Sequence, residues 1–144
     1  MTKQTRILLL IGLLSLLSVK GFSQLSISYY ASSLSKIGLG YNFNDKLWGE
    51  LRLYSNTTFD DITPELVFCY NIVKKERHDI YLGLGANVGY MAGFVMPVGV
   101  QFIPLENFDR FSLHIEFQPT LDTRNQEFIL QSSCGLRYTF GKKE

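Results

Sequence analysis

Apolar side chains recur at every second position of this chain, over segments of about ten residues. Residues 110–121 show the pattern most clearly, with large apolar and polar side chains in strict alternation: Phe111, Ser112, Leu113, His114, Ile115, Glu116, Phe117 and Gln118. Successive side chains of a β-strand point to opposite faces, so this period places all the apolar groups on one face. From residue 24 onward no segment has the period of an amphipathic helix. We therefore predict an all-β domain.

Turn signals divide this part of the chain into eight predicted strands. They span residues 25–31, 35–43, 47–55, 62–73, 79–89, 94–103, 110–119 and 127–140. The connections alternate between two sets, which places odd connections at one end of the sheet and even connections at the other. The pattern predicts an antiparallel up-and-down arrangement that uses the whole of residues 24–144 as a single domain.

Residues 1–23 have a different character. Lys3 and Arg6 precede an apolar run over residues 7–19, and Gly21, Phe22 and Ser23 form a small-x-small site after it. This order is typical of a secretory signal peptide, and it predicts cleavage after Ser23. The run is shorter than the about 20 apolar residues that a membrane-spanning helix needs, and Lys20 follows it directly. We predict that residues 1–23 are a cleavable signal peptide and that residues 24–144 are exported.

The two faces of the predicted strands differ in an unusual way. One face is apolar, and the opposite face is small or uncharged more often than charged: Gly38, Gly40, Asn42, Gly83, Gly85, Asn87, Gly99 and Gln101 lie on it. A soluble sandwich would match its apolar face with a strongly charged one. A face rich in glycine suits the inside of a narrow closed barrel, where small residues leave room for large ones. The predicted hairpins place Gly40 opposite Glu50 and Gly38 opposite Arg52.

Apolar groups outside and small polar groups inside, in an even number of strands, are typical of a transmembrane β-barrel. The final segment CGLRYTFGKKE alternates Leu136, Tyr138 and Phe140 and has an aromatic residue near its end. The chain resembles the small eight-stranded outer-membrane barrels of Gram-negative bacteria, of the OmpA membrane-domain and OmpX kind. Its GKKE tail departs from relatives that stop at the aromatic residue.

This resemblance implies an eight-stranded antiparallel transmembrane β-barrel in the cell outer membrane, with both termini in the periplasm. It implies contact with outer-membrane lipid, recognition of the C-terminal strand by the barrel-assembly machinery, and a monomer. An aromatic belt at one membrane surface is expected near one set of turns: Tyr41, Phe43, Trp48, Phe102, Phe108, Phe111, Tyr138 and Phe140. Trp48 fits the outward parity poorly and is expected at the mouth of the lumen. Pro97 falls inside a predicted strand and is expected at a bulge.

Six inward positions carry groups that titrate or are charged: Glu50, Arg52, Glu65, His114, Glu116 and Arg137. Burying such groups singly is costly, so we predict that they form a polar network inside the lumen. The predicted pairing brings Arg52 opposite Glu65, and we expect these two side chains to touch. It also places Gly99 opposite His114, which we expect within hydrogen-bond reach of an inward acidic or amide group.

The same face suggests an enzymatic alternative. Ser112, His114 and Glu116 share it, and outer-membrane lipid A deacylases and palmitoyltransferases use serine with histidine and an acidic partner. The deacylases carry the histidine two residues before the serine, facing lipid, whereas here Ser112 comes first and both residues face inward. We therefore favour a structural or interaction protein with a side-chain-filled lumen and no general pore. The alternatives are a lipid A acyl-modifying enzyme with His114 as its base, and a secreted lipocalin-like binding barrel.

Composition and spacing argue against other classes. With 14 basic and 13 acidic residues and no basic patch, the chain gives no electrostatic case for nucleic acid. Metal binding is not predicted, because His78 lies in a turn and His114 has no second histidine or cysteine on its face. No cofactor is predicted. Cys69 should point inward and Cys134 outward, which disfavours a disulfide between them.

Overall fold

The computed structural model describes residues 25–54, 63–89 and 92–140, together with Gln4, Ile7 and Ile11. The predicted cleavage site and most of the predicted signal peptide lie outside these residues. The strands are β1 Leu25–Ala31, β2 Lys36–Asn42, β3 Leu47–Tyr54, β4 Pro64–Lys74, β5 His78–Asn87, β6 Gly93–Val95, β7 Val98–Phe102, β8 Phe111–Asp122 and β9 Glu127–Thr139. No helix within the described part of the chain is long and apolar enough to cross a membrane.

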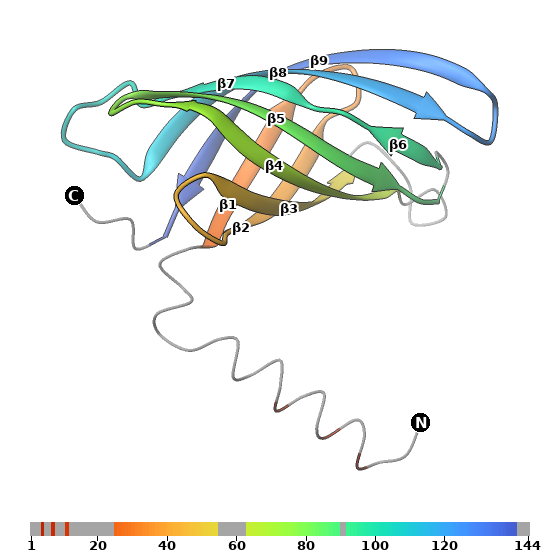
Figure 1. The fold of residues 1–144 in the computed structure, drawn as a ribbon, viewed down its shortest axis with the longest axis horizontal. Coiled ribbons are helices and arrows are strands. Elements are labelled where there is room, and N and C mark those ends of the chain that lie inside the picture. The colour runs from red at the N-terminus through yellow and green to blue at the C-terminus, as the bar shows by residue number, and fades with distance from the viewer. Residues whose placement is uncertain are drawn as a thin grey trace.

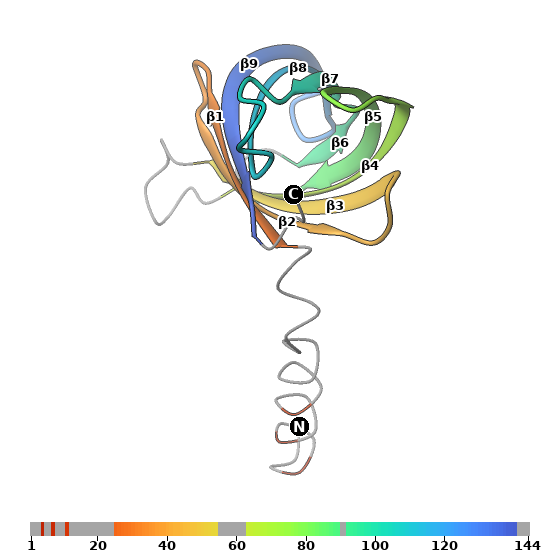
Figure 2. The ribbon, with the colours of Figure 1, turned by 90° about the vertical axis from the view of Figure 1, so that its left-hand side faces the viewer.

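The strands form one closed antiparallel barrel. Apart from β6 and β7, each strand pairs with its neighbours in sequence, and β1 pairs with β9 to close the sheet. β6 and β7 lie end to end between β5 and β8, so they are two parts of one strand of the wall. Figure 2, which looks along the barrel, shows the closed ring. The all-β, eight-stranded antiparallel barrel predicted from the sequence is confirmed.

The break between β6 and β7 lies at Met96 and Pro97. Proline has no backbone N–H, so the strand cannot continue its ladder there. The register is the same on both sides of the break, since Val95 pairs with Gly85 and Val98 with Leu82. The bulge expected at Pro97 was therefore wrong. The irregularity lies in β4 instead, where the register with β5 shifts between residues 71 and 73.

Most of the predicted cross-strand pairs are present. Gly40 lies opposite Glu50, and Arg52 lies opposite both Gly38 and Glu65. The pair predicted between Gly99 and His114 was wrong, because Gly99 faces Glu116 and His114 faces Gln101 and Gly135. The error is two residues, because Phe102 pairs with Leu113, so the unpaired part of this connection extends farther into β8 than into β7. A shift of two keeps every side chain on its predicted face.

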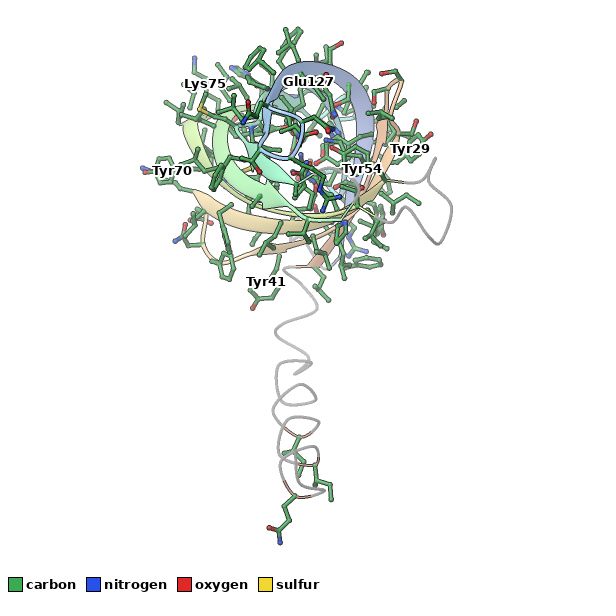
Figure 3. The ribbon with its side chains drawn as sticks, turned by 90° about the vertical axis from the view of Figure 1, so that its right-hand side faces the viewer. Tyr29, Tyr41, Tyr54, Tyr70, Lys75 and Glu127 are labelled. Atoms are coloured by element: carbon green, nitrogen blue, oxygen red, sulfur yellow. The ribbon has the colours of Figure 1, made fainter. Side chains whose placement is uncertain are left out.

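The faces are apolar outside and polar inside. Figure 3 shows Tyr29, Tyr41 and Tyr70 pointing outward from the ring, whereas Tyr54 points to the interior. The outward side chains of the strands are exposed and mostly large and apolar, with Leu84 67% exposed. Near the termini, Phe108 packs beside Phe111 and Tyr138 at ring distances of 6.4 and 6.3 Å. Trp48 departs from this outer group, because it is buried inside the barrel.

Candidate functional site

The interior of the barrel holds all six predicted polar residues. Arg52, Glu65, His114 and Glu116 have no exposed surface, and Glu50 and Arg137 are also buried. They extend from β3, β4, β8 and β9, whose inward positions alternate with apolar outward ones. The structure adds residues that join them by hydrogen bonds. The interior polar network comprises Tyr30, Lys36, Glu50, Arg52, Tyr54, Glu65, Tyr81, Glu116, Gln118 and Arg137.

Arg52 is the centre of this network. Its guanidinium donates two hydrogen bonds, at 2.7 and 2.9 Å, to the carboxylate of Glu116. Glu116 lies on β8, which does not pair with β3, the strand of Arg52. Nε donates to Glu50 at 2.7 Å, and Nη1 donates to Gln118 at 3.0 Å. The expected contact with Glu65 is present but longer, at 3.4 Å. Paired hydrogen bonds between guanidinium and carboxylate are the stronger kind, so Glu116 is the main partner of Arg52.

Arg137 forms a second group with Tyr30 and Glu50. It donates to Glu50 at 2.9 Å, to Tyr30 at 3.0 Å and, through Nε, to Ser28 at 2.8 Å. The Tyr30 hydroxyl donates in turn to Glu50 and accepts from Arg52 at 2.9 Å. Tyr30 thus joins the two arginines, and the guanidinium of Arg137 also lies 4.1 Å from the centre of the Trp48 ring.

Lys36 brings a third cation to the interior. Its Nζ lies 3.6 Å from Glu65 and donates to Gln118 at 2.9 Å. Gln118 donates to Glu65 at 2.9 Å, and the Tyr54 hydroxyl donates to the same carboxylate at 3.0 Å. Lys36, Arg52 and Arg137 therefore face Glu50, Glu65 and Glu116, so the interior polar network carries equal numbers of positive and negative groups.

His114 does not take part in these bonds. Its two ring nitrogens are buried and have no hydrogen-bond partner among the described residues. The ring packs instead against Tyr30, with 4.4 Å between the ring centres. The expected hydrogen bond from His114 to an acidic or amide group was therefore wrong. Its cross-strand neighbour Gln101 accepts from Arg137 at 2.6 Å, so this amide oxygen is already engaged.

The serine, histidine and glutamate of the enzymatic alternative are not linked to one another. The Ser112 hydroxyl donates to the backbone oxygen of Arg137 at 3.5 Å. Glu116 accepts from Arg52 and, at 2.6 Å, from the Tyr81 hydroxyl. A nucleophile and its base need a hydrogen bond between them, and the base needs an orienting partner. The described residues contain neither bond.

Other potential sites are few. The described residues contain no group of three or more histidine, cysteine, aspartate or glutamate side chains placed to hold a metal ion. Cys69 is buried and Cys134 exposed, as their parity predicts, and both are free thiols. A polar pocket of about 230 Å³ opens at the end of the barrel near the termini. Its lining includes Trp48, Asn71, Lys74, Gln101 and Arg137.

Some interior residues were missed from the sequence although their parity was readable. Lys36 lies two positions before the inward Gly38 and within the predicted strand 35–43, so its parity also predicts an inward side chain. Tyr30 alternates with the outward Tyr29, and Tyr81 with Leu82. No protein-family model matches the chain, and no curated protein or solved structure matches it either.

Proposed function

We propose that this chain is a structural or interaction protein of a bacterial outer membrane, held in lipid by its outer surface and closed inside by the interior polar network. The observation that carries the proposal is that charged and apolar side chains have exchanged the places that they take in a soluble protein. The interior buries the charged side chains of Lys36, Glu50, Arg52, Glu65, Glu116 and Arg137, while exposed Leu, Ile, Val, Phe and Tyr side chains ring the exterior of the strands. Contiguous exposed apolar patches larger than a few hundred Å² are rare on soluble monomers.

A lipid environment accounts for this reversal. All backbone groups of a membrane-spanning segment must be bonded within the protein, and a closed antiparallel barrel achieves this along its paired strands. The paired aromatic rings near the termini suit a membrane surface, where amphipathic rings are favoured. A secreted lipocalin-like barrel would instead keep its apolar face inside, around a ligand. The interior of this barrel is filled by ion pairs.

The interior polar network also supports a role other than a general pore. Arg52 of β3 reaches Glu116 of β8, and Arg137 of β9 reaches Glu50 of β3, so side chains cross the lumen in two places. An eight-stranded barrel is just wide enough for such side chains to fill it. A solute would have to break several buried ion pairs to pass. The proposed protein is therefore a closed barrel that acts through its surfaces.

Membrane fractionation of cells that express the full chain tests this proposal. We expect the mature protein in the outer-membrane fraction, resistant to extraction without detergent, and we expect it to migrate differently on a gel before and after boiling. A chain that starts at residue 24 is the matched control, and it should accumulate without reaching the membrane. Mature protein that stays soluble without detergent would contradict the proposal. A change in lipid A acyl chains between cells with and without the gene would instead favour an enzyme.

A further inference from the structure

The wall of the barrel is uneven at the end away from the termini. β1 pairs with β9 only over residues 134–139, whereas β8 pairs with β9 as far as Glu127. Residues 127–133 of β9 therefore have a neighbouring strand on one side only within the described chain. Figure 1 shows the hairpin of β8 and β9 extending well beyond the turn between β1 and β2. We call residues 127–133 the β9 edge.

The backbone groups of the β9 edge that point to its open side can be identified from the backbone hydrogen bonds at the C-terminal end of β9. Phe140 N donates to Leu25 O at 2.8 Å, toward β1, and Thr139 N donates to Arg110 O at 2.8 Å, toward β8. Successive residues of a strand direct their N–H and C=O groups to alternate sides. The register of β8 with β9 runs without interruption to Glu127. Even-numbered residues therefore face the open side, so the β9 edge offers the N–H and C=O groups of Phe128, Leu130 and Ser132.

The side chains of the β9 edge continue the pattern of the barrel. Phe128 and Leu130 point outward and are 64% and 62% exposed. Gln131 points inward and is 7% exposed, and its Nε2 has no hydrogen-bond partner among the described residues, although its Oε1 accepts from Tyr54. A strand laid along this edge would pack apolar side chains beside Phe128 and Leu130. It would also bring a polar acceptor toward the free amide of Gln131.

We propose that the β9 edge binds an extended segment of a partner polypeptide by strand addition. An unpaired strand edge is a template for another chain, because only an extended backbone presents donors and acceptors at the matching spacing. The partner segment is about five to seven residues long and alternates apolar with polar side chains, the polar ones facing Gln131. Binding of this partner segment would be the interaction role of the proposed membrane barrel.

A second copy of this chain fits the β9 edge less well. Two identical edges form a symmetric hydrogen-bonded pair only when they run antiparallel, about an axis across the strands. Such a pair would point the two barrels in opposite directions. This step rests on the proposed function, because copies inserted in one membrane share one orientation. The partner is therefore a different polypeptide.

Amide hydrogen exchange of the folded barrel in detergent tests whether the edge is open. We expect the amides of Phe128, Leu130 and Ser132 to exchange faster than those of Ile129 and Gln131, which face β8. Equal protection of the two sets would overturn the proposal. Failure of the proposed function has a different signature, since a chain that lies outside the membrane shows no difference in gel migration on boiling.

A synthetic peptide tests whether the edge accepts a strand. The probe is LSISYYA, the sequence of β1, which pairs with the lower part of the same β9 strand. We expect it to bind and to protect the three open amides. The same peptide with alternate amides N-methylated should bind about tenfold more weakly, since it loses hydrogen bonds but keeps its side chains. Equal binding of the two peptides would overturn strand addition.

Three variants at Leu130 complete the test. Leu130→Pro removes an N–H that has no partner in the strand ladder of the described residues, so the barrel should still fold and shift on boiling but lose peptide binding. Leu130→Val, the matched control, should keep both properties. Undiminished binding by Leu130→Pro would overturn the proposal. A disulfide-linked dimer formed by Leu130→Cys in a Cys134→Ser background would identify a second copy as the occupant, and so would also overturn it.

Discussion

Removal of Arg52 should destabilise the barrel more than removal of any other single interior group. Arg52 has no exposed surface and bonds to four acidic or amide side chains, among which Glu116 receives two bonds. Arg52→Met would leave Glu50, Glu65 and Glu116 facing two cations. Removing one partner of a buried ion pair costs about 3 to 5 kcal/mol, because the other charge stays buried without compensation. We expect a loss of this size in the free energy of unfolding.

A second substitution should restore much of this stability. In Arg52→Met with Glu116→Gln, two cations face two carboxylates, and the new amide oxygen still accepts from the Tyr81 hydroxyl. The remaining loss should be about 1 to 2 kcal/mol, the size expected for neutral hydrogen bonds. In Arg52→Met with Glu65→Gln, the recovery should be smaller. Glu65 lies farther from Arg52, and its neutralisation leaves Lys36 without its carboxylate.

Urea unfolding of the refolded protein in detergent measures these differences. Trp48 is the single tryptophan and is buried beside Tyr81, with 5.1 Å between the ring centres, so its fluorescence reports the interior. The order of stability should be wild type, the Glu116 double variant, the Glu65 double variant and then the single variant. A Glu116 double variant no more stable than the single variant would refute the reasoning that a stranded buried charge dominates. Greater recovery by the Glu65 double variant would refute the assignment of Glu116 as the main partner.

Three further tests address the outer face, the histidine and the close contacts of the interior. In a urea titration of the protein refolded in lipid bilayers, Leu84→Arg should cost about 2 to 4 kcal/mol. In the same titration, Leu105→Arg, at a residue 55% exposed but outside the strands, should be near neutral. His114→Leu removes two buried nitrogens without partners, so unfolding at equal or higher urea is expected, and a loss above about 1 kcal/mol would contradict it. Gly38→Ala should destabilise the barrel, because the added Cβ would lie 2.6 Å from the Glu50 carboxylate; a lower yield of refolded protein on an unboiled gel would show this.

The faces of the strands could be predicted from the sequence because the side-chain period of a strand is two. The predicted register of β7 with β8 was wrong by two residues. Because a shift of two residues leaves the faces unchanged, Glu116 and His114 were still correctly assigned to the interior. The bond between Arg52 and Glu116 could not be predicted in this way. The two residues lie on strands that are not neighbours, and only the diameter of the closed barrel brings them together.

His114 has no hydrogen-bond partner among the described residues, and this could not be predicted from the sequence either, because contacts across the lumen decide it. Its neighbours along and across the strands are Glu116 and Gln101, which are both hydrogen-bonding groups. Both, however, are engaged by arginines from β3 and β9. Competition among side chains across the lumen decides which groups remain free, and sequence parity carries no information about it.

The interior polar network also helps to specify how the barrel closes. A slip of one residue in any strand would turn its buried charges to the outer face, so each ion pair penalises the wrong register. Arg137 contributes most to this selection, because its acceptors lie on β1, β3 and β7 while the residue itself lies on the last strand. These acceptors surround Arg137 only after β9 has paired with both β1 and β8. The charges inside the lumen are therefore fully compensated only in the closed barrel, and an open sheet would leave Glu50 without one of its two arginines.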